Sequence, residues 1–264
     1  MRVIIVDTTS ESDSTGPRVA AALRSLGHEL DVLRRPQLSP SAGADLGHRL
    51  CDTWRSAGGP DVALTLGWVA GLAAEVAARE CPMPVLLRLP RPGRSGDDRI
   101  TRVERALVRT APVVLASCPS EAEALVTMGA VRSKVLVLPP MAPLVARELG
   151  RSDLDGEPEV ITALDDSPAD VDAVLLGMAA GRPAVVLDRG ILPDLVADGV
   201  SGIVVPARGD LAATVRSLRT DQIGREAMGL AAADRVAACF SPEVVTAALA
   251  RVLVTARRRA LQPS

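Results

Sequence analysis

One stretch in the second half of the chain constrains the fold most, because helix and strand signals alternate along it. Residues 172–180 place apolar side chains on one helical face, and Gly181 follows as a C-terminal cap. Residues 184–187 form a continuous apolar run, which is typical of a strand buried on both faces. Residues 192–197 predict a short helix and residues 202–205 a second apolar strand. We therefore expect consecutive helix–strand units of a parallel sheet, and an α/β fold.

The same alternation runs through the rest of the chain. Further strands are predicted at residues 2–6, 27–33, 60–67, 84–89, 113–116, 134–138 and 159–164. Helices are predicted at residues 17–26, 46–57, 69–79, 120–129, 211–218, 224–239 and 242–259, and residues 36–45 are predicted to be a loop. In the last helix, four apolar residues form a stripe suited to packing on the first domain: Leu249, Val252, Leu253 and Ala256.

Composition excludes several classes of function. A net charge of −2 argues against an electrostatic nucleic-acid partner. No apolar run reaches the roughly 18 residues of a membrane span, and the chain enters a strand at once instead of a signal peptide, so we expect a cytoplasmic protein without a transmembrane segment. The four cysteines are scattered, without the close pairs of a zinc site, so no metal site is predicted and four buried thiols are the simpler interpretation.

Three motifs in the constraining stretch carry a resemblance to a known family. They are MAAGRP (residues 178–183), GILPD (residues 190–194) and DGVSG (residues 198–202). In this order they resemble the sugar-nucleotide half of retaining glycosyltransferases of the GT-B fold, glycosyltransferase family 4 in particular. The resemblance implies a Rossmann-like domain at residues 1–140, a linker at residues 141–158, and a GT-B-like second domain with a helical tail at residues 159–264. It also implies a nucleotide-sugar donor and no other cofactor.

The sequence departs from the family's pattern at the donor site. The family's second domain opens with a complete mononucleotide-binding half, whereas here only a short polar segment separates Pro143 from the next predicted strand. The family clamps the donor diphosphate with an arginine and a lysine, but the chain's single lysine, Lys134, falls in the first domain. Pro168 and Leu176 stand where the family has its pair of glutamates. We therefore expect a truncated second domain, a degenerate donor site and little or no transferase activity.

Nine residues are candidates for binding the donor, each with a structural alternative: Gly16, Trp68, Arg88, Arg91, Arg94, Asp166, Arg182, Gly190 and Asp194. Gly16 stands at the family's Gly-Gly turn, at a helix N-terminus that could bind an anion, or in a plain turn. Trp68 follows a strand end, where ligands sit in parallel sheets, but tryptophan is more often part of a core.

The charged candidates also have two interpretations each. Arg88, Arg91 and Arg94 could hold a phosphate or carboxylate at a strand end, and a solvated loop has the same composition. Asp166 could face the donor or belong to a turn and helix cap. Asp194 matches the acidic residue of the family's G-G-x-x-E, which chiefly shapes the loop. No catalytic residue is assigned.

Two hypotheses from different classes remain. In the first, the chain is a retaining glycosyltransferase in which arginines such as Arg91 and Arg182 replace the lost clamp. In the second, it is a noncatalytic relative that binds a ligand, associates with itself or binds a partner glycosyltransferase. The second hypothesis predicts an apolar patch where the missing strands would have packed.

Overall fold

The computed structural model describes residues 1–10, 13–36, 39–143 and 159–260. Residues 144–158, which make up most of the predicted linker, lie outside the described residues. The chain divides into two compact units. Unit 1 comprises Met1–Leu138 and Thr246–Ser264, and unit 2 comprises Pro139–Val245.

Unit 1 is built on a six-stranded parallel sheet in the order β2-β1-β3-β4-β5-β6. The strands are β1 (Arg2–Asp7), β2 (Glu29–Arg34), β3 (Val62–Leu66), β4 (Val85–Arg88), β5 (Val113–Ala116) and β6 (Val135–Val137). The central strands are apolar and buried on both faces, as the sequence predicts for a parallel sheet. The mixed α/β architecture is therefore confirmed.

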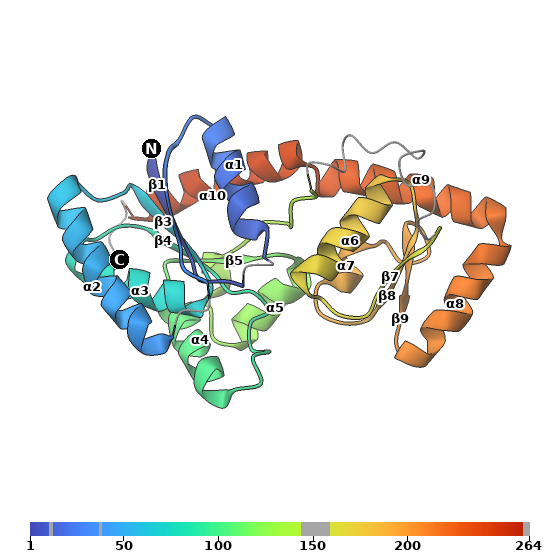
Figure 1. Cartoon of the computed structure of the whole chain (residues 1–264), viewed down its shortest axis with the longest axis horizontal. Helices are drawn as coiled ribbons and strands as arrows, with labels where there is room; N and C mark the ends of the chain where they lie inside the picture. The colour runs from blue at the N-terminus through green and yellow to red at the C-terminus, as the bar shows by residue number, and fades with distance from the viewer. Residues whose placement is uncertain (11–12, 37–38, 144–158, 261–264) are drawn as a thin grey trace. The chain divides into compact units, whose positions relative to one another are not determined.

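Helices connect these strands on both faces of the sheet. They are α1 (Thr15–Ser25), α2 (Pro40–Ala57), α3 (Trp68–Glu80), α4 (Asp98–Thr110) and α5 (Pro119–Thr127), followed by a single 3-10 turn, η1 (Arg132–Lys134). Figure 1 shows α1 on one side of the sheet and α2 to α5 on the other. This arrangement follows from right-handed crossovers, because the chain moves in one direction from β1 to β2 and in the opposite direction afterwards.

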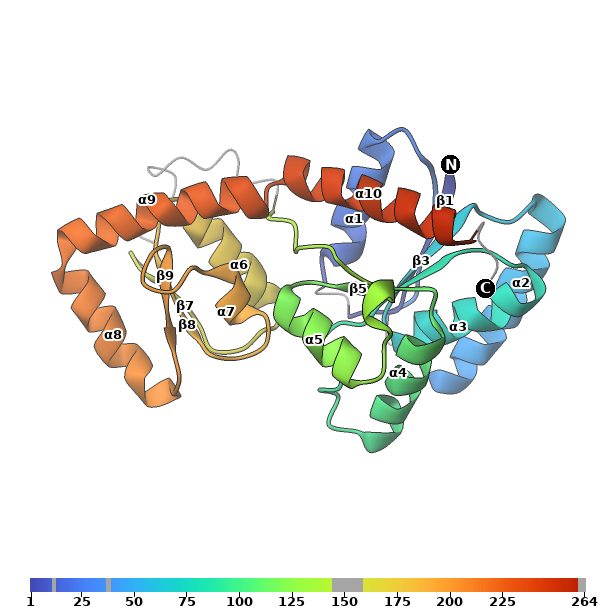
Figure 2. The same cartoon turned by 180° about the vertical axis from the view of Figure 1, so that it is seen from behind.

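The last helix, α10 (Pro242–Ala260), lies almost wholly in unit 1 (Figure 2). The predicted stripe of Leu249, Val252, Leu253 and Ala256 is buried, with 1 to 5% of each residue exposed. At the end of the helix, Arg259 Nη2 donates to the carbonyl oxygen of Ser133 at 2.6 Å. The stripe therefore packs as predicted.

Unit 2 contains a three-stranded parallel sheet in the order β7-β8-β9, with strands β7 (Ile161–Ala163), β8 (Ala184–Leu187) and β9 (Gly202–Val205). Its helices are α6 (Pro168–Ala179), α7 (Leu192–Leu195), α8 (Arg208–Thr220) and α9 (Gln222–Cys239). The predicted bounds of β8 and β9 are confirmed residue for residue. Both strands are short runs with clear borders: Pro183 and Asp188 flank β8, and Pro206 follows β9.

The end of α6 confirms the predicted glycine cap. Gly181 has a φ of 76°, in the left-handed region, and its N–H donates to the carbonyl oxygen of Met178. The N–H of Arg182 donates to the carbonyl oxygen of Gly177 at 3.0 Å. These two bonds form a Schellman motif, which satisfies carbonyl groups that the helix itself leaves open.

Two helix starts differ from the predictions. The predicted loop at residues 36–45 contains the first turns of α2, because Ser39 Oγ accepts the N–H of Ala42 and Pro40 occupies the first turn of the helix. The predicted cap Ser120–Glu121 lies inside α5, whose N-cap is Cys118: its Sγ accepts the N–H of Glu121 at 3.4 Å.

One helical stretch, Gln222–Arg259, is long and apolar enough to cross a membrane by length and composition alone. Core helices of soluble proteins pass the same test, so one such stretch is weak evidence for a membrane span. It is interrupted between α9 and α10 at Phe240 and Ser241. Several of its apolar side chains, among them Val236, Leu249 and Leu253, are buried within the protein.

Candidate functional site

The sheet of unit 1 has a reversal of strand order between β1 and β3, because β2 lies on one side of β1 and β3 to β6 on the other. In open parallel sheets, ligands bind beyond the carboxyl ends of the strands at such a reversal. Asp7 ends β1 and Leu66 ends β3, and their neighbouring loops are joined by a bond from the N–H of Thr8 to the carbonyl oxygen of Leu66 at 3.0 Å. This place is therefore the first candidate site.

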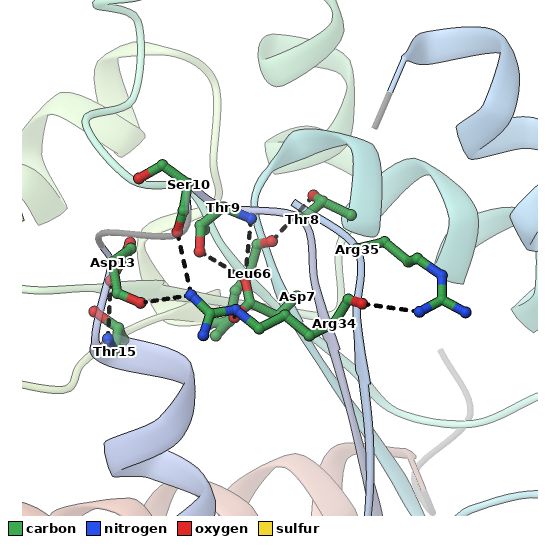
Figure 3. Close-up of polar contacts among 9 residues, drawn as sticks. All are labelled: Asp7, Thr8, Thr9, Ser10, Asp13, Thr15, Arg34, Arg35 and Leu66. Atoms are coloured by element: carbon green, nitrogen blue, oxygen red, sulfur yellow. Dashed lines mark hydrogen bonds and ion pairs between the residues drawn. The ribbon is translucent and has the colours of Figure 1, made fainter. Parts of the chain in front are cut away.

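Asp7 is at the centre of this site and is 1% exposed. Its Oδ1 accepts two hydrogen bonds from Thr9, one from the backbone N–H at 2.9 Å and one from Oγ1 at 2.6 Å (Figure 3). Its Oδ2 lies 3.5 Å from Arg34 Nε, at the end of the neighbouring strand β2. The Arg34 guanidinium also donates to the carbonyl oxygens of Ser10 and Asp13. The loop after β1 is thus held by a buried carboxylate and a cation from the next strand.

The N-terminus of α1 lies beside this carboxylate. Asp13 Oδ1 accepts the N–H of Thr15, the first residue of the helix, at 2.8 Å. Gly16, a predicted donor-binding residue, packs so closely on Asp7 that a β-carbon there would overlap Oδ2 and lie 3.3 Å from Leu66 Cδ1. The glycine is needed for this close approach. Two carboxylates of the chain therefore occupy the helix end at which a phosphate could otherwise bind.

The end of β3 leads directly into α3 through Gly67, which has a φ of 96°. Thr8 Oγ1 accepts the N–H of Ala70 at 3.2 Å and so caps this helix from the neighbouring strand. Trp68, the second predicted residue in this region, is partly buried and packs against the core cluster that contains Leu89 and Leu107. This position matches the structural alternative for the tryptophan, and its role towards a ligand stays a prediction.

The predicted arginines follow β4 at the same edge of the sheet. Arg88 is the last residue of β4, and its Nη2 donates to Ser117 Oγ, just beyond β5, at 3.0 Å. The loop that continues to Arg91 and Arg94 is fixed by Glu104 of α4, whose Oε2 accepts the N–H of Gly93 at 2.8 Å. Burial raises the pKa of the Glu104 carboxyl, and the Gly93 N–H partly offsets this shift. This hydrogen bond anchors the loop that carries Arg91 and Arg94 to α4.

In unit 2, the carboxyl edge of the sheet gathers acidic side chains. Asp165 and Asp166 follow β7, and Asp188 follows β8. Asp166 is 7% exposed, and Asp165 Oδ1 lies 3.6 Å from Arg189 Nε. Gly190, the predicted residue beside Arg189, has a φ of 59° and opens the turn into α7. Asp166 and Gly190 therefore lie at one edge of the sheet, and their role towards a donor stays a prediction.

The N-terminus of α6 lies at this edge as well. Ser167 Oγ accepts the N–H of Asp170 at 3.1 Å and donates to Asp170 Oδ2 at 2.9 Å. Ser167 is thus the N-cap of α6, which agrees with the alternative that residues 165–168 form a turn and helix cap. One N–H of this helix end is therefore satisfied by the Ser167 hydroxyl, which in turn donates to the Asp170 carboxylate.

The structure does not bring Arg182 together with these residues. Arg182 lies between the end of α6 and the start of β8, at the amino-terminal edge of the sheet, opposite Asp166 and Gly190. Asp194 lies in the short helix α7, whose carbonyl groups are held by Arg235: Nη2 donates to the carbonyl oxygen of Asp194 and Nε to that of Leu195, each at 2.7 Å. These two hydrogen bonds hold the backbone of α7 in place, so the segment around Asp194 serves to fix the shape of this loop.

Sequence reasoning missed Asp7, Thr9, Asp13 and Arg34. The available signal was a carboxylate directly after a buried apolar strand, where the polar group must find partners. Its cationic partner comes from the next strand, and only the register that pairs Asp7 with Arg34 brings the two together. In the described parts of the chain, no group of three or more His, Cys, Asp or Glu side chains is arranged to hold a metal ion.

Comparisons with known proteins identify the fold. No protein-family model and no curated protein sequence matches the chain. Among solved structures, HepE from Anabaena in complex with UDP-glucose is similar with a TM-score of 0.75 at 12% identity, over 97% of this chain and 100% of that chain. Sucrose-phosphate synthase from Thermosynechococcus elongatus is similar with a TM-score of 0.73 at 14% identity, over 97% and 99% of the two chains.

A third similar structure is named as an epimerase. A UDP-N-acetylglucosamine 2-epimerase from Listeria monocytogenes is similar with a TM-score of 0.60 at 11% identity, over 100% of this chain and 97% of that chain. Identities this low show the fold alone. The chain thus has the GT-B fold of glycosyltransferases, and a fold of this kind does not by itself define an activity.

Proposed function

We propose that this GT-B-fold protein is a noncatalytic relative of nucleotide-sugar glycosyltransferases that acts by binding a ligand or a partner. The observation that carries the proposal is the charge at the carboxyl edge of the unit 2 sheet. Asp165, Asp166 and Asp188 follow β7 and β8 there, beside Arg189, and Arg208 follows β9 at the start of α8. A glycosyl transfer leaves negative charge on the departing diphosphate, and stabilising such charge is usually the largest catalytic effect. The carboxylates of an acidic edge would instead repel the negative charge of a departing diphosphate.

The strand order of unit 2 supports the same proposal. In the described residues, the sheet runs β7-β8-β9 in chain order, with no reversal of direction. The crevice that binds phosphates in such sheets forms where the order reverses. The described part of unit 2 therefore offers no crevice of this type, and the α6 N-terminus at its edge is satisfied by Ser167 and Asp170.

Chain length supports a missing half-domain. A strand–helix–strand unit needs about 30 residues, and a mononucleotide-binding half needs more than one strand–helix pair. Only residues 144–158 stand between the described parts on either side of the gap. We infer that the nucleotide-binding front half of the second domain, and with it the family's clamp, is absent from this chain.

The first test is thermal unfolding of the purified chain with a panel of nucleoside diphosphates and nucleotide sugars. A ligand at about 100 times its dissociation constant adds roughly 2.7 kcal/mol of stability, or about 5–10 °C in Tm for a chain of this size. We expect no shift with any of them, and no release of sugar or nucleoside diphosphate from the nucleotide sugars. A selective shift accompanied by transfer or hydrolysis would overturn the proposal.

A matched pair of variants makes the test sharper if a nucleotide binds. Arg189 and Arg182 carry the same charge, but they lie at opposite edges of the unit 2 sheet. Binding at the carboxyl edge is lost in Arg189→Ala and retained in Arg182→Ala. Equal losses in both variants would show a general electrostatic attraction and would leave no specific donor site.

A second function, a retaining glycosyltransferase, is favoured by one observation in unit 1. Arg88 and Ser117 are joined at the ends of adjacent strands, and Arg91 and Arg94 follow in an ordered loop. Arginine guanidinium groups bind phosphate oxygens in pairs, so this edge could hold an anionic substrate group. Arg88→Ala and Arg91→Ala would then weaken nucleotide-sugar binding. If neither variant does so, this second function fails.

The binding role predicts an association that can be measured. Ile223 and Leu230 of α9 are 84% and 61% exposed and are seven residues apart, so they lie on the same side of the helix. Exposed apolar side chains of this size are common at interfaces.

In β7, where the missing strands would have packed, Thr162 is exposed and Ala163 is buried, so the predicted apolar patch is not on this strand. Light scattering after size-exclusion chromatography, with and without a candidate partner glycosyltransferase, tests self-association and partner binding.

A further inference from the structure

Two of the four cysteines lie next to each other in unit 1 although 30 residues separate them in the sequence. Cys51 is in the middle of α2, and Cys81 follows the last turn of α3. Their sulfur atoms are 4.0 Å apart, and Cys81 Sγ is 3.9 Å from the carbonyl oxygen of Cys51. Closing the distance to a bond of about 2.05 Å requires a shift of roughly 2 Å, which side-chain rotation can supply.

The two thiols differ in their surroundings. Cys51 is 3% exposed and belongs to the core cluster between the sheet and α2 and α3, whereas Cys81 is partly exposed and packs against that cluster. Cys51 Sγ donates to Glu80 Oε2 at 3.3 Å, and the same carboxylate oxygen is paired with Arg55. A reagent in solution therefore reaches Cys81 first, and a carboxylate stands beside Cys51 to accept its proton.

We propose that Cys51 and Cys81 form a reversible dithiol–disulfide site that reacts with small disulfides such as glutathione disulfide. The site depends on the juxtaposition of one accessible and one buried thiol on two packed helices. It is independent of any nucleotide or sugar function. Burial raises the pKa of the Cys51 thiol, which agrees with a role for Cys51 as the second thiol to react.

The reaction has two balanced steps. The Cys81 thiolate attacks one sulfur of glutathione disulfide, forms a mixed disulfide and releases one glutathione thiolate. The Cys51 thiolate then attacks Cys81 Sγ, forms the bond between the two cysteines and releases the second glutathione thiolate. Two protons from the cysteines end on the two glutathione thiols. The protein is oxidised by two electrons, and the glutathione disulfide is reduced by the same two.

The bond would join α2 to the end of α3 around the intervening strand β3. Closing a loop of about 30 residues restricts the unfolded chain and so stabilises the folded one. For a chain of this size we expect the oxidised form to unfold at a temperature about 5–10 °C higher than the reduced form. Reduction with dithiothreitol should reverse the change.

The test treats the full chain with glutathione disulfide and identifies the products by intact mass and by mapping of non-reduced peptides. We expect a product lighter by two hydrogen atoms, with Cys51 and Cys81 in one linked peptide pair. Cys51→Ala should stop at a glutathione adduct on Cys81, and Cys81→Ala should not react while folded. Cys239→Ala, which changes another partly buried cysteine, should behave like the wild type.

Two results would overturn the proposal. A stable glutathione adduct on Cys81 of the unmodified chain, with Cys51 still reduced, would show that the two sulfur atoms cannot meet. A disulfide formed equally well in Cys81→Ala would show that another pair reacts. Because Cys51→Ala alters a buried position, circular dichroism checks that this variant is folded. If Cys51→Ala is unfolded, the comparison of Cys81→Ala with the unmodified chain tests the proposal.

Discussion

The contact between α6 and β7 allows a sharp test of the unit 2 packing. Gly177 is inside α6, and a β-carbon at this position would overlap Ile161 Cγ1 and lie 2.6 Å from Ile161 Cδ1. Gly177→Ala therefore introduces a methyl group where a β-branched side chain of the adjacent strand already lies. The neighbour cannot yield easily, because the close atom is near the strand backbone and χ1 of isoleucine is restricted.

Two opposing effects set the magnitude. Replacing glycine by alanine inside a helix stabilises the helix by about 1 kcal/mol. Overpacking a core costs about 1–3 kcal/mol, and the upper end applies here because the overlap reaches Cγ1. We expect Gly177→Ala to lower the free energy of unfolding by about 2 kcal/mol. Gly209→Ala is the matched control: Gly209 lies in α8, and no atom is within 4 Å of the place a β-carbon would take, so this variant should gain about 0.5–1 kcal/mol.

The assay is urea unfolding followed by far-ultraviolet circular dichroism, which reports on the helices of both units. Trp54 and Trp68 are both in unit 1, so fluorescence gives a separate measure of that unit. A double-mutant cycle with Ile161→Ala isolates the contact, because truncating Ile161 removes the atoms that Gly177→Ala would strike. A stable Gly177→Ala variant, or additive effects in the cycle, would refute the packing argument.

Three further predictions use other contacts. Arg235→Ala loses two hydrogen bonds to the carbonyl oxygens at the end of α7 and a cation–π contact with Phe240, whose ring centroid lies 5.8 Å from the guanidinium carbon. Urea unfolding should show a free energy of unfolding lower by about 1–3 kcal/mol. Arg235→Lys should regain only part of this lost stability. Gly16→Ala should destabilise the chain by about 1–3 kcal/mol, because its methyl group would overlap the Asp7 carboxylate that Thr9 holds in place. The melting temperature measures this loss, and an unchanged melting temperature would contradict the close approach of Gly16 to Asp7. Burial raises the pKa of Glu104 in the folded state above its unfolded value of about 4.3, so the folded state binds the Glu104 proton more tightly. The stability that this proton contributes is therefore present below about pH 4.3 and is lost as the pH rises through the folded pKa. Glu104→Gln keeps an oxygen acceptor for the Gly93 N–H and should flatten the decline in melting temperature above pH 4, whereas an unchanged pH profile would show that Glu104 is not its source.

The sequence predicted the strand pattern better than the helix starts. The first six residues of α2, residues 40–45, contain Pro, Ser and Gly, which suggested a loop. In the structure, Gly43 of this stretch and Gly47 of the next turn face α3 so closely that β-carbons would lie 2.6 Å from Val69 Cγ1 and 2.8 Å from Val76 Cβ. The glycines are there because the two helices pack tightly, which is a tertiary cause that composition alone does not reveal.

The sequence named the candidate residues one by one and did not predict which of them lie together. In the structure, Asp166 and Gly190 lie at one edge because each follows a strand of one parallel sheet, and parallel strands end at the same edge. The motif that includes Arg182 carried no such information, since a residue just before a strand lies at the opposite edge. The Asp7–Arg34 pair depends on a register between β1 and β2 that no local pattern contains.

In the described residues, the proposed lack of a donor phosphate site has a different physical cause in each unit. Unit 1 has the reversal of strand order that such a site requires, but Asp13 and Asp7 fill the space at the N-terminus of α1 with negative charge. A few substitutions could remove that obstacle. In the described part of unit 2, the reversal itself is missing, and restoring it would require additional strands beside β7. Under this proposal, point mutation cannot restore a donor site in unit 2, so nucleotide binding gained by substituting Asp13 and Asp7 would arise in unit 1 alone.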